Sequence, residues 1–159
     1  MSVVDEVTQA NQRYASGFAK GDLPMPPGRK FAVVTCMDAR LDPAGFLGLH
    51  EGDAHVIRNA GGLVNDETIR SLVISHHLLG TQEALVIGHS DCGMVTFTND
   101  VLHDRLGPES HDIDFQAFPD IEERVRESVR RIEESPLLPD SFTATGFVYE
   151  VETGKLRGV

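Results

Sequence analysis

Four short apolar runs alternate along the chain with longer segments of helical character, and this alternation constrains the fold most. The runs cover residues 31–35, 54–57, 84–87 and 146–151. The segments between them include expected helices at 65–79, 93–106 and 119–134. Strands that alternate with helices predict βαβ units and a mostly parallel sheet. We therefore expect an α/β fold whose sheet is flanked by helices, with a short last strand after residue 151.

The segment before the first strand differs from the rest of the chain. Residues 1–19 are typical of a helical arm, and residues 23–28 are too rich in proline for a helix or a central strand. We expect residues 1–30 to form this arm and its connection, and residues 31–159 to form one α/β domain. A chain of 159 residues suits a single domain.

The charge of the chain narrows the range of partners. Fourteen Lys and Arg against 25 Asp and Glu give a net charge of −11. Nucleic acid is excluded as a partner, since a phosphate-binding protein needs clustered basic residues. No run approaches the ~18 consecutive apolar residues of a membrane-spanning helix. A cytoplasmic protein without a membrane partner is the expectation.

Both cysteines follow strands of the expected sheet. Cys36 comes directly after the first strand, and His89 and Cys92 follow the third. Ligands of open α/β sheets bind outside the carboxyl ends of the strands, so these side chains should meet at one rim. Two thiolates and an imidazole form the ligand set of a catalytic zinc with one open position. Two small buried cysteines and a redox dithiol are the alternatives, although the chain has no Cys-x-x-Cys.

A charged pair follows Cys36 at alternate positions. Asp38 and Arg40 share a face with Cys36 if the backbone there is extended. The arginine can hold the aspartate ionised, and the aspartate could then accept a proton from water on the metal. It could instead become the fourth zinc ligand and close the site, or the pair could be an ordinary structural ion pair. Arg58 and Asn59, at another strand end, suit a functional role or the ordering of a loop.

These motifs together resemble a known family. Cys36-x-Asp38-x-Arg40 with His89-x-x-Cys92 is similar to the paired signature of the β-class carbonic anhydrases. Residues 51–62 and 89–94 also resemble the small bacterial branch of that family. The resemblance covers nearly the whole chain, from the helical arm to residues 153–155.

The resemblance implies a site and a reaction. Cys36, His89 and Cys92 would ligate Zn²⁺, with Asp38 and Arg40 as the catalytic dyad. Zinc-bound hydroxide would attack CO2 and release bicarbonate. The family also implies a homodimer or homotetramer in which the arm lies across the partner. Candidates for the substrate pocket share small or apolar character: Ile57, Gly61, Val64, Gly93 and Met94.

Two other functions stay open at this point. The compact relatives include hydrolases of carbonyl sulfide or carbon disulfide, which are linear molecules of similar shape attacked by the same hydroxide. A zinc-binding interaction or sensor module, closed by Asp38, is a remoter alternative.

Overall fold

The four expected strands and the expected short last strand all form in the computed structural model, which describes residues 1–159. The sheet order is β2-β1-β3-β4-β5. The first four strands run parallel, and β5 is antiparallel to β4. The mostly parallel α/β sheet is therefore confirmed. The strands are β1 (Phe31–Cys36), β2 (Ala54–Asn59), β3 (Glu83–His89), β4 (Thr143–Tyr149) and β5 (Leu156–Gly158).

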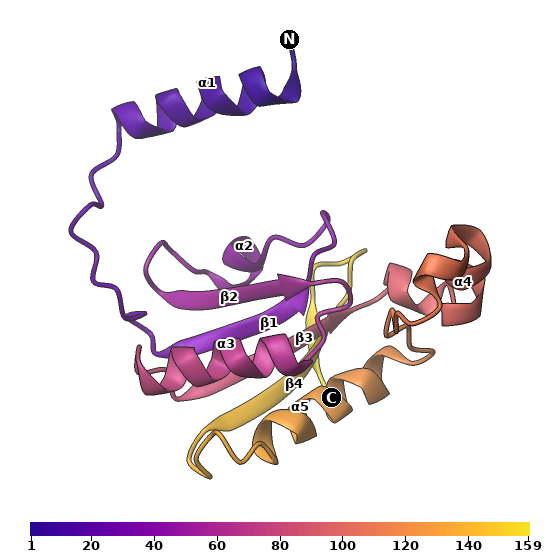
Figure 1. The fold of residues 1–159 in the computed structure, drawn as a ribbon. Coiled ribbons are helices and arrows are strands. Elements are labelled where there is room, and N and C mark those ends of the chain that lie inside the picture. The colour runs from indigo at the N-terminus through magenta and orange to yellow at the C-terminus, as the bar shows by residue number, and fades with distance from the viewer.

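Helices cover the two faces of this sheet unequally. Figure 1 shows α3 and α5 along one face and the short α2 on the other. The α-helices are α1 (Val3–Ser16), α2 (Pro43–Leu47), α3 (Asp66–His77), α4 (Asn99–Leu106) and α5 (Ile121–Glu133). Two single turns of 3₁₀-helix, η1 (Gly93–Val95) and η2 (Pro108–Ser110), lie between β3 and α5.

The core is divided by β1, a strand inside the sheet whose six residues are all buried. Successive side chains of a strand point to opposite faces of the sheet. Ala32 and Val34 pack in a cluster with Leu72 of α3. Phe31 and Val33 belong to a separate cluster on the other face, where α2 packs. Burial on both faces is the property that the apolar sequence of β1 predicts.

The helical arm contacts the body of the protein near its end, where the Tyr14 hydroxyl donates to the Glu51 carboxylate at 3.3 Å. Figure 1 shows α1 at a distance from the sheet, joined to it by a long irregular connection. Ser2 and Asp5 form a reciprocal capping box at its start. None of its residues is buried. The helix ends at its C-cap Gly17, one of the two ends expected for the arm, and its apolar side chains face solvent in the single chain.

The expected helix at 93–106 is wrong as one element, because it divides into η1 and α4. The side chain of Thr96 donates a hydrogen bond of 2.7 Å to the carbonyl of Gly93. The N–H of Phe118 donates to the carbonyl of Met94 at 3.3 Å. These carbonyls would otherwise serve the next turn of a continuous helix. The helical backbone therefore ends after η1, and α4 begins after Thr98, its N-cap, which has extended backbone angles.

Candidate metal centre

Cys36, His89 and Cys92 meet at the carboxyl ends of two adjacent strands. Cys36 is the last residue of β1, His89 is the last of β3, and Cys92 directly precedes η1. Their ligand atoms all lie within 4.8 Å of one another. The three residues are only 5%, 1% and 2% exposed. The structure thus brings together the three residues that the sequence predicted as metal ligands.

The imidazole of His89 is held in the state that a metal ligand needs. Its Nδ1 lies 2.8 Å from the carbonyl oxygen of Ser90, which can only accept a hydrogen bond. Nδ1 therefore carries the proton, and Nε2 keeps its lone pair. This Nε2 is buried and has no hydrogen-bond partner. A buried acceptor without a donor is costly unless a cation binds it, so the donor set fits a metal ion.

The two thiols differ in acidity because they lie against each other. A hydrogen bond from Cys92 lowers the pKa of Cys36, and contacts with His89 act in the same direction. The N–H of Gly61 also points at the sulfur of Cys36, at 3.3 Å. Pairing with Cys36 and burial raise the pKa of Cys92. Without a metal ion the pair thus retains one proton, which a cation can replace.

Asp38 lies beside this cluster but is turned toward Arg40. The Nε and one terminal nitrogen of Arg40 donate to the two carboxylate oxygens at 3.0 and 2.8 Å. The backbone N–H of Arg40 adds a third hydrogen bond, of 2.9 Å. The guanidinium therefore holds the pKa of the Asp38 carboxyl well below its usual range. One carboxylate oxygen is 3.8 Å from Nε2 of His89, so an ionised Asp38 borders the metal position.

A second aspartate holds Arg40 from the opposite side. A terminal nitrogen of Arg40 lies 2.7 Å from the Asp91 carboxylate, and the other donates to the Asp91 carbonyl at 2.9 Å. Arg40 therefore joins the loop that carries Cys36 to the loop that carries Cys92. Asp91 was not predicted from the sequence, since its contact with Arg40 depends on its left-handed backbone, with φ of 54°.

Arg58 and Asn59 order the loops around the centre. Arg58 donates to the carbonyls of Cys36 and Asp38, at 2.9 and 2.7 Å. Asn59 exchanges hydrogen bonds with the backbone of Leu63. Of the two roles expected for this pair, loop ordering is the one that these contacts support.

The predicted pocket residues fall into two groups. Gly61 contacts the Cys36 sulfur, Gly93 directly follows Cys92, and Met94 packs in the small buried cluster that contains both cysteines. Ile57 and Val64 instead pack in the main core, under α3 and α5. Ile57 packs in this core because it pairs with Val34 in the sheet, so both side chains face the same side. Neither of these two residues lies among the cysteines.

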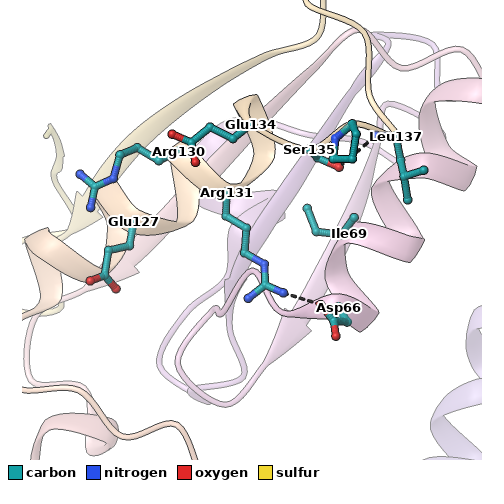
Figure 2. Close-up of a pocket in the computed structure, with 9 residues that line it drawn as sticks. Asp66, Ile69, Glu127, Arg130, Arg131, Glu134, Ser135 and Leu137 are labelled. Atoms are coloured by element: carbon teal, nitrogen blue, oxygen red, sulfur yellow. Dashed lines mark hydrogen bonds and ion pairs between the residues drawn. The ribbon is translucent and has the colours of Figure 1, made fainter.

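A surface groove between α3 and α5 is away from this centre. Figure 2 shows it between α3 and α5, lined mainly by charged side chains, with an ion pair between Arg131 and Asp66. It holds none of the residues of the cysteine cluster. We therefore place the chemistry at the buried rim of the sheet and not in this groove.

Comparisons with known proteins agree with the arrangement of the site. The carbonic anhydrase family model matches residues 31–115. The chain is 50% identical to β-carbonic anhydrase 1 of Mycobacterium tuberculosis, over 100% of this chain and 99% of the relative. The chain belongs to the β-carbonic anhydrase family. Its Cys-His-Cys cluster is the metal site of that family.

Solved structures and a second group of relatives extend this result. The fold matches carbonic anhydrase from Streptococcus mutans with a TM-score of 0.93 and 47% identity, covering 100% of this chain and 98% of the other. The chain is also 34% identical to carbon disulfide hydrolase of Saccharolobus solfataricus, over 97% of this chain and 87% of the relative. None of the helices of this β-carbonic anhydrase is long and apolar enough to span a membrane.

Proposed function

We propose that the protein catalyses the reversible hydration of carbon dioxide to bicarbonate and a proton at a zinc ion. The observation that carries this proposal is the unpartnered Nε2 of His89 next to two thiols and an ionised aspartate. The full-length identity of 50% to a β-carbonic anhydrase supports the same reaction.

The ligand set favours zinc over other common metals. Soft thiolates and a neutral imidazole suit Zn²⁺, whereas Mg²⁺ and Ca²⁺ prefer oxygen ligands. Cys36, His89 and Cys92 would hold the ion and leave a fourth position open. When bound, zinc lowers the pKa of a water molecule to about 7 and so supplies hydroxide at neutral pH.

Asp38 and Arg40 would orient the attacking group. An ionised carboxylate can only accept hydrogen bonds, so Asp38 would bind the proton of the nucleophile and leave an oxygen lone pair directed at CO2. Arg40 keeps this carboxylate ionised and turned away from the cysteines. Asp38 would thus be prevented from occupying the fourth metal position itself.

The proton produced in the reaction has a short way to solvent. A surface hollow beside Arg40 is lined by Asp91, Glu150 and Glu152. These carboxylates make the surface beside Arg40 acidic. The dyad therefore lies between the buried metal position and an acidic, open surface.

Zinc content and stopped-flow CO2 hydration, measured on one preparation, test the proposal. We expect about one zinc per chain, and loss of both zinc and activity in Cys36→Ser and His89→Ala. His50→Ala is the matched control, because the side chain of His50 is 84% exposed and lies outside the cluster. Wild-type hydration no faster than buffer, with zinc bound between pH 6.5 and 9, would contradict the proposal.

Hydrolysis of carbonyl sulfide or carbon disulfide is the second candidate. It is favoured by the identity of 34% to a carbon disulfide hydrolase over nearly the whole chain. Sulfide release, assayed beside CO2 hydration, separates the two reactions. An inactive protein in which the Asp38 carboxylate ligates zinc at every pH would instead indicate a closed interaction or sensor module.

The exposed arm supports assembly into a homodimer or homotetramer. Val3, Val4 and Val7 of α1 are 72%, 70% and 58% exposed, and no part of the same chain covers them. A contiguous apolar surface of this kind marks an interaction site. We expect sedimentation to give at least twice the mass of one chain, and Val7→Glu to lower the mass more than Gln9→Glu does. A monomeric wild-type protein would contradict this assembly.

A further inference from the structure

The two cysteines of the chain lie close enough to react with each other. The sequence has only Cys36 and Cys92, and both are free thiols. Their sulfur atoms lie within 4.8 Å of each other. Since the two sulfurs of a disulfide are ~2.05 Å apart, they would have to approach by less than about 3 Å. Cys92 follows β3 in a loop, so a small shift of this loop and a change of side-chain rotamer can close the gap.

A bound zinc ion would keep these two sulfurs from reacting. In tetrahedral coordination with Zn–S distances of ~2.3 Å, two sulfur ligands are about 3.8 Å apart, which is too far for a disulfide. Each sulfur also shares a lone pair with the metal, and this lowers its reactivity toward an oxidant. Removal of the ion leaves two thiols side by side.

Small molecules can reach the pair from the side of Asp38. Cys36 and Cys92 are 5% and 2% exposed, and apolar side chains pack around them, so a bulky oxidant is excluded. The Asp38 side chain is 16% exposed, and its carboxylate lies 3.8 Å from Nε2 of His89. A metal ion and its substrate would enter on this side. A molecule as small as hydrogen peroxide can follow the same route.

We propose that Cys36 and Cys92 are an oxidation site, at which a small hydroperoxide forms a disulfide after the metal has left. The Cys36 sulfur attacks one peroxide oxygen, the O–O bond breaks, and the released hydroxide leaves as water with the Cys36 proton. The Cys92 sulfur then attacks the sulfur of the sulfenic acid, the S–O bond breaks, and a second water carries off the Cys92 proton. Two thiols thus lose two electrons and two protons, and one peroxide becomes two waters.

Oxidation and metal binding exclude each other at this site. The disulfide uses two of the three metal ligands and leaves only His89, so an oxidised chain stays metal-free until it is reduced. Bound zinc in turn protects the thiols. This inference rests on the metal site alone and holds whether or not the protein hydrates CO2.

Peroxide treatment of zinc-loaded and chelator-stripped protein, followed by mass spectrometry, tests the proposal. The stripped protein should lose about 2 Da at its cysteines, and a non-reducing peptide map should join the peptides of Cys36 and Cys92 within one chain. The zinc-loaded protein should keep both thiols. Met25 is the internal control for the dose, because it is 80% exposed and should be oxidised equally in both samples.

A matched variant separates a paired thiol from a lone one. Cys92→Ser removes the second thiol, so in stripped protein Cys36 should proceed to the sulfinic acid and gain about 32 Da. Stripped wild-type protein that also ends as the sulfinic acid, or that forms its disulfide between two chains, would overturn the proposal. Zinc-loaded protein that forms the disulfide as fast as stripped protein would overturn it too.

Zinc uptake gives a second readout that needs no assay of CO2 hydration. Protein that is stripped and then oxidised should bind zinc at least about tenfold more weakly than untreated protein. Protein that is treated with peroxide while zinc-loaded, and stripped afterwards, should take up about one zinc per chain again. Undiminished zinc affinity in a chain whose cysteines are joined would contradict the exclusion of metal by the disulfide.

Discussion

Replacement of Gly62 by alanine should damage the metal centre through the backbone, without touching a ligand. Gly62 has φ of 62°, and a Cβ there would lie 2.9 Å from the backbone carbon of Thr35 and 3.0 Å from the nitrogen of Cys36. Gly48 is the matched control, since it has the same φ of 62° but no atom within 4 Å of its Cβ position. The two substitutions share the strain of left-handed backbone and differ in the clash.

The expected losses of unfolding free energy follow from the backbone strain and from the clash of the new Cβ. Left-handed backbone costs an alanine about 1–2 kcal/mol, which is the loss of unfolding free energy that we expect in Gly48→Ala. Gly62→Ala adds about 1–3 kcal/mol for displacing backbone in a packed core. The displaced loop also carries the Gly61 N–H that binds the Cys36 sulfur. Loss of such a supporting contact lowers metal affinity by about 10–100-fold.

Urea denaturation and zinc competition with a chelator measure the two effects. Gly62→Ala should lose about 2–5 kcal/mol of unfolding free energy and at least about tenfold in zinc affinity, and Gly48→Ala should keep the wild-type affinity. Equal losses of stability, with unchanged zinc affinity in both variants, would refute the idea that the glycine loop supports Cys36.

Two further predictions concern charge at the centre. Asp91→Ala should keep its zinc and lose at most a few-fold in kcat, because the Arg40–Asp91 ion pair is exposed and therefore weak. An unchanged rate in stopped-flow hydration would mean that Asp91 does not help to position Arg40. The raised pKa of Cys92 keeps a proton on the Cys36–Cys92 pair at neutral pH when no metal is bound. Because zinc must displace this proton, the zinc association constant should rise at least about tenfold per pH unit between pH 6 and 8. Chelator competition across that range measures this slope, and an affinity independent of pH would contradict the shared proton.

The ligand trio was predictable from sequence because it depends on topology alone. Once the runs before Cys36 and His89 are taken as neighbouring parallel strands, their carboxyl ends must meet. The prediction required no knowledge of side-chain geometry. The pairing of Asp38 with Arg40 was predicted from alternate positions along an extended backbone. The structure instead has a turn at residues 39–40, in which the Arg40 N–H donates to the Asp38 carboxylate.

Other features depend on contacts that a sequence pattern does not show. The ion pair of Asp91 with Arg40 requires left-handed backbone at Asp91. The separation of η1 from α4 depends on Phe118, far along the chain, whose N–H donates to a carbonyl of η1. Ile57 was expected in the pocket because it is apolar and near a strand end. Its face of the sheet is set by the pairing of β1 with β2, which periodicity in so short a run does not specify.

The central claim is that a zinc ion on Cys36, His89 and Cys92 hydrates CO2. Titration of the metal-free protein with zinc, followed by stopped-flow CO2 hydration at each step, tests it most directly. We expect the activity to rise in proportion to bound zinc and to reach a plateau at about one ion per chain. A fully zinc-loaded wild-type protein that hydrates CO2 no faster than buffer would contradict it.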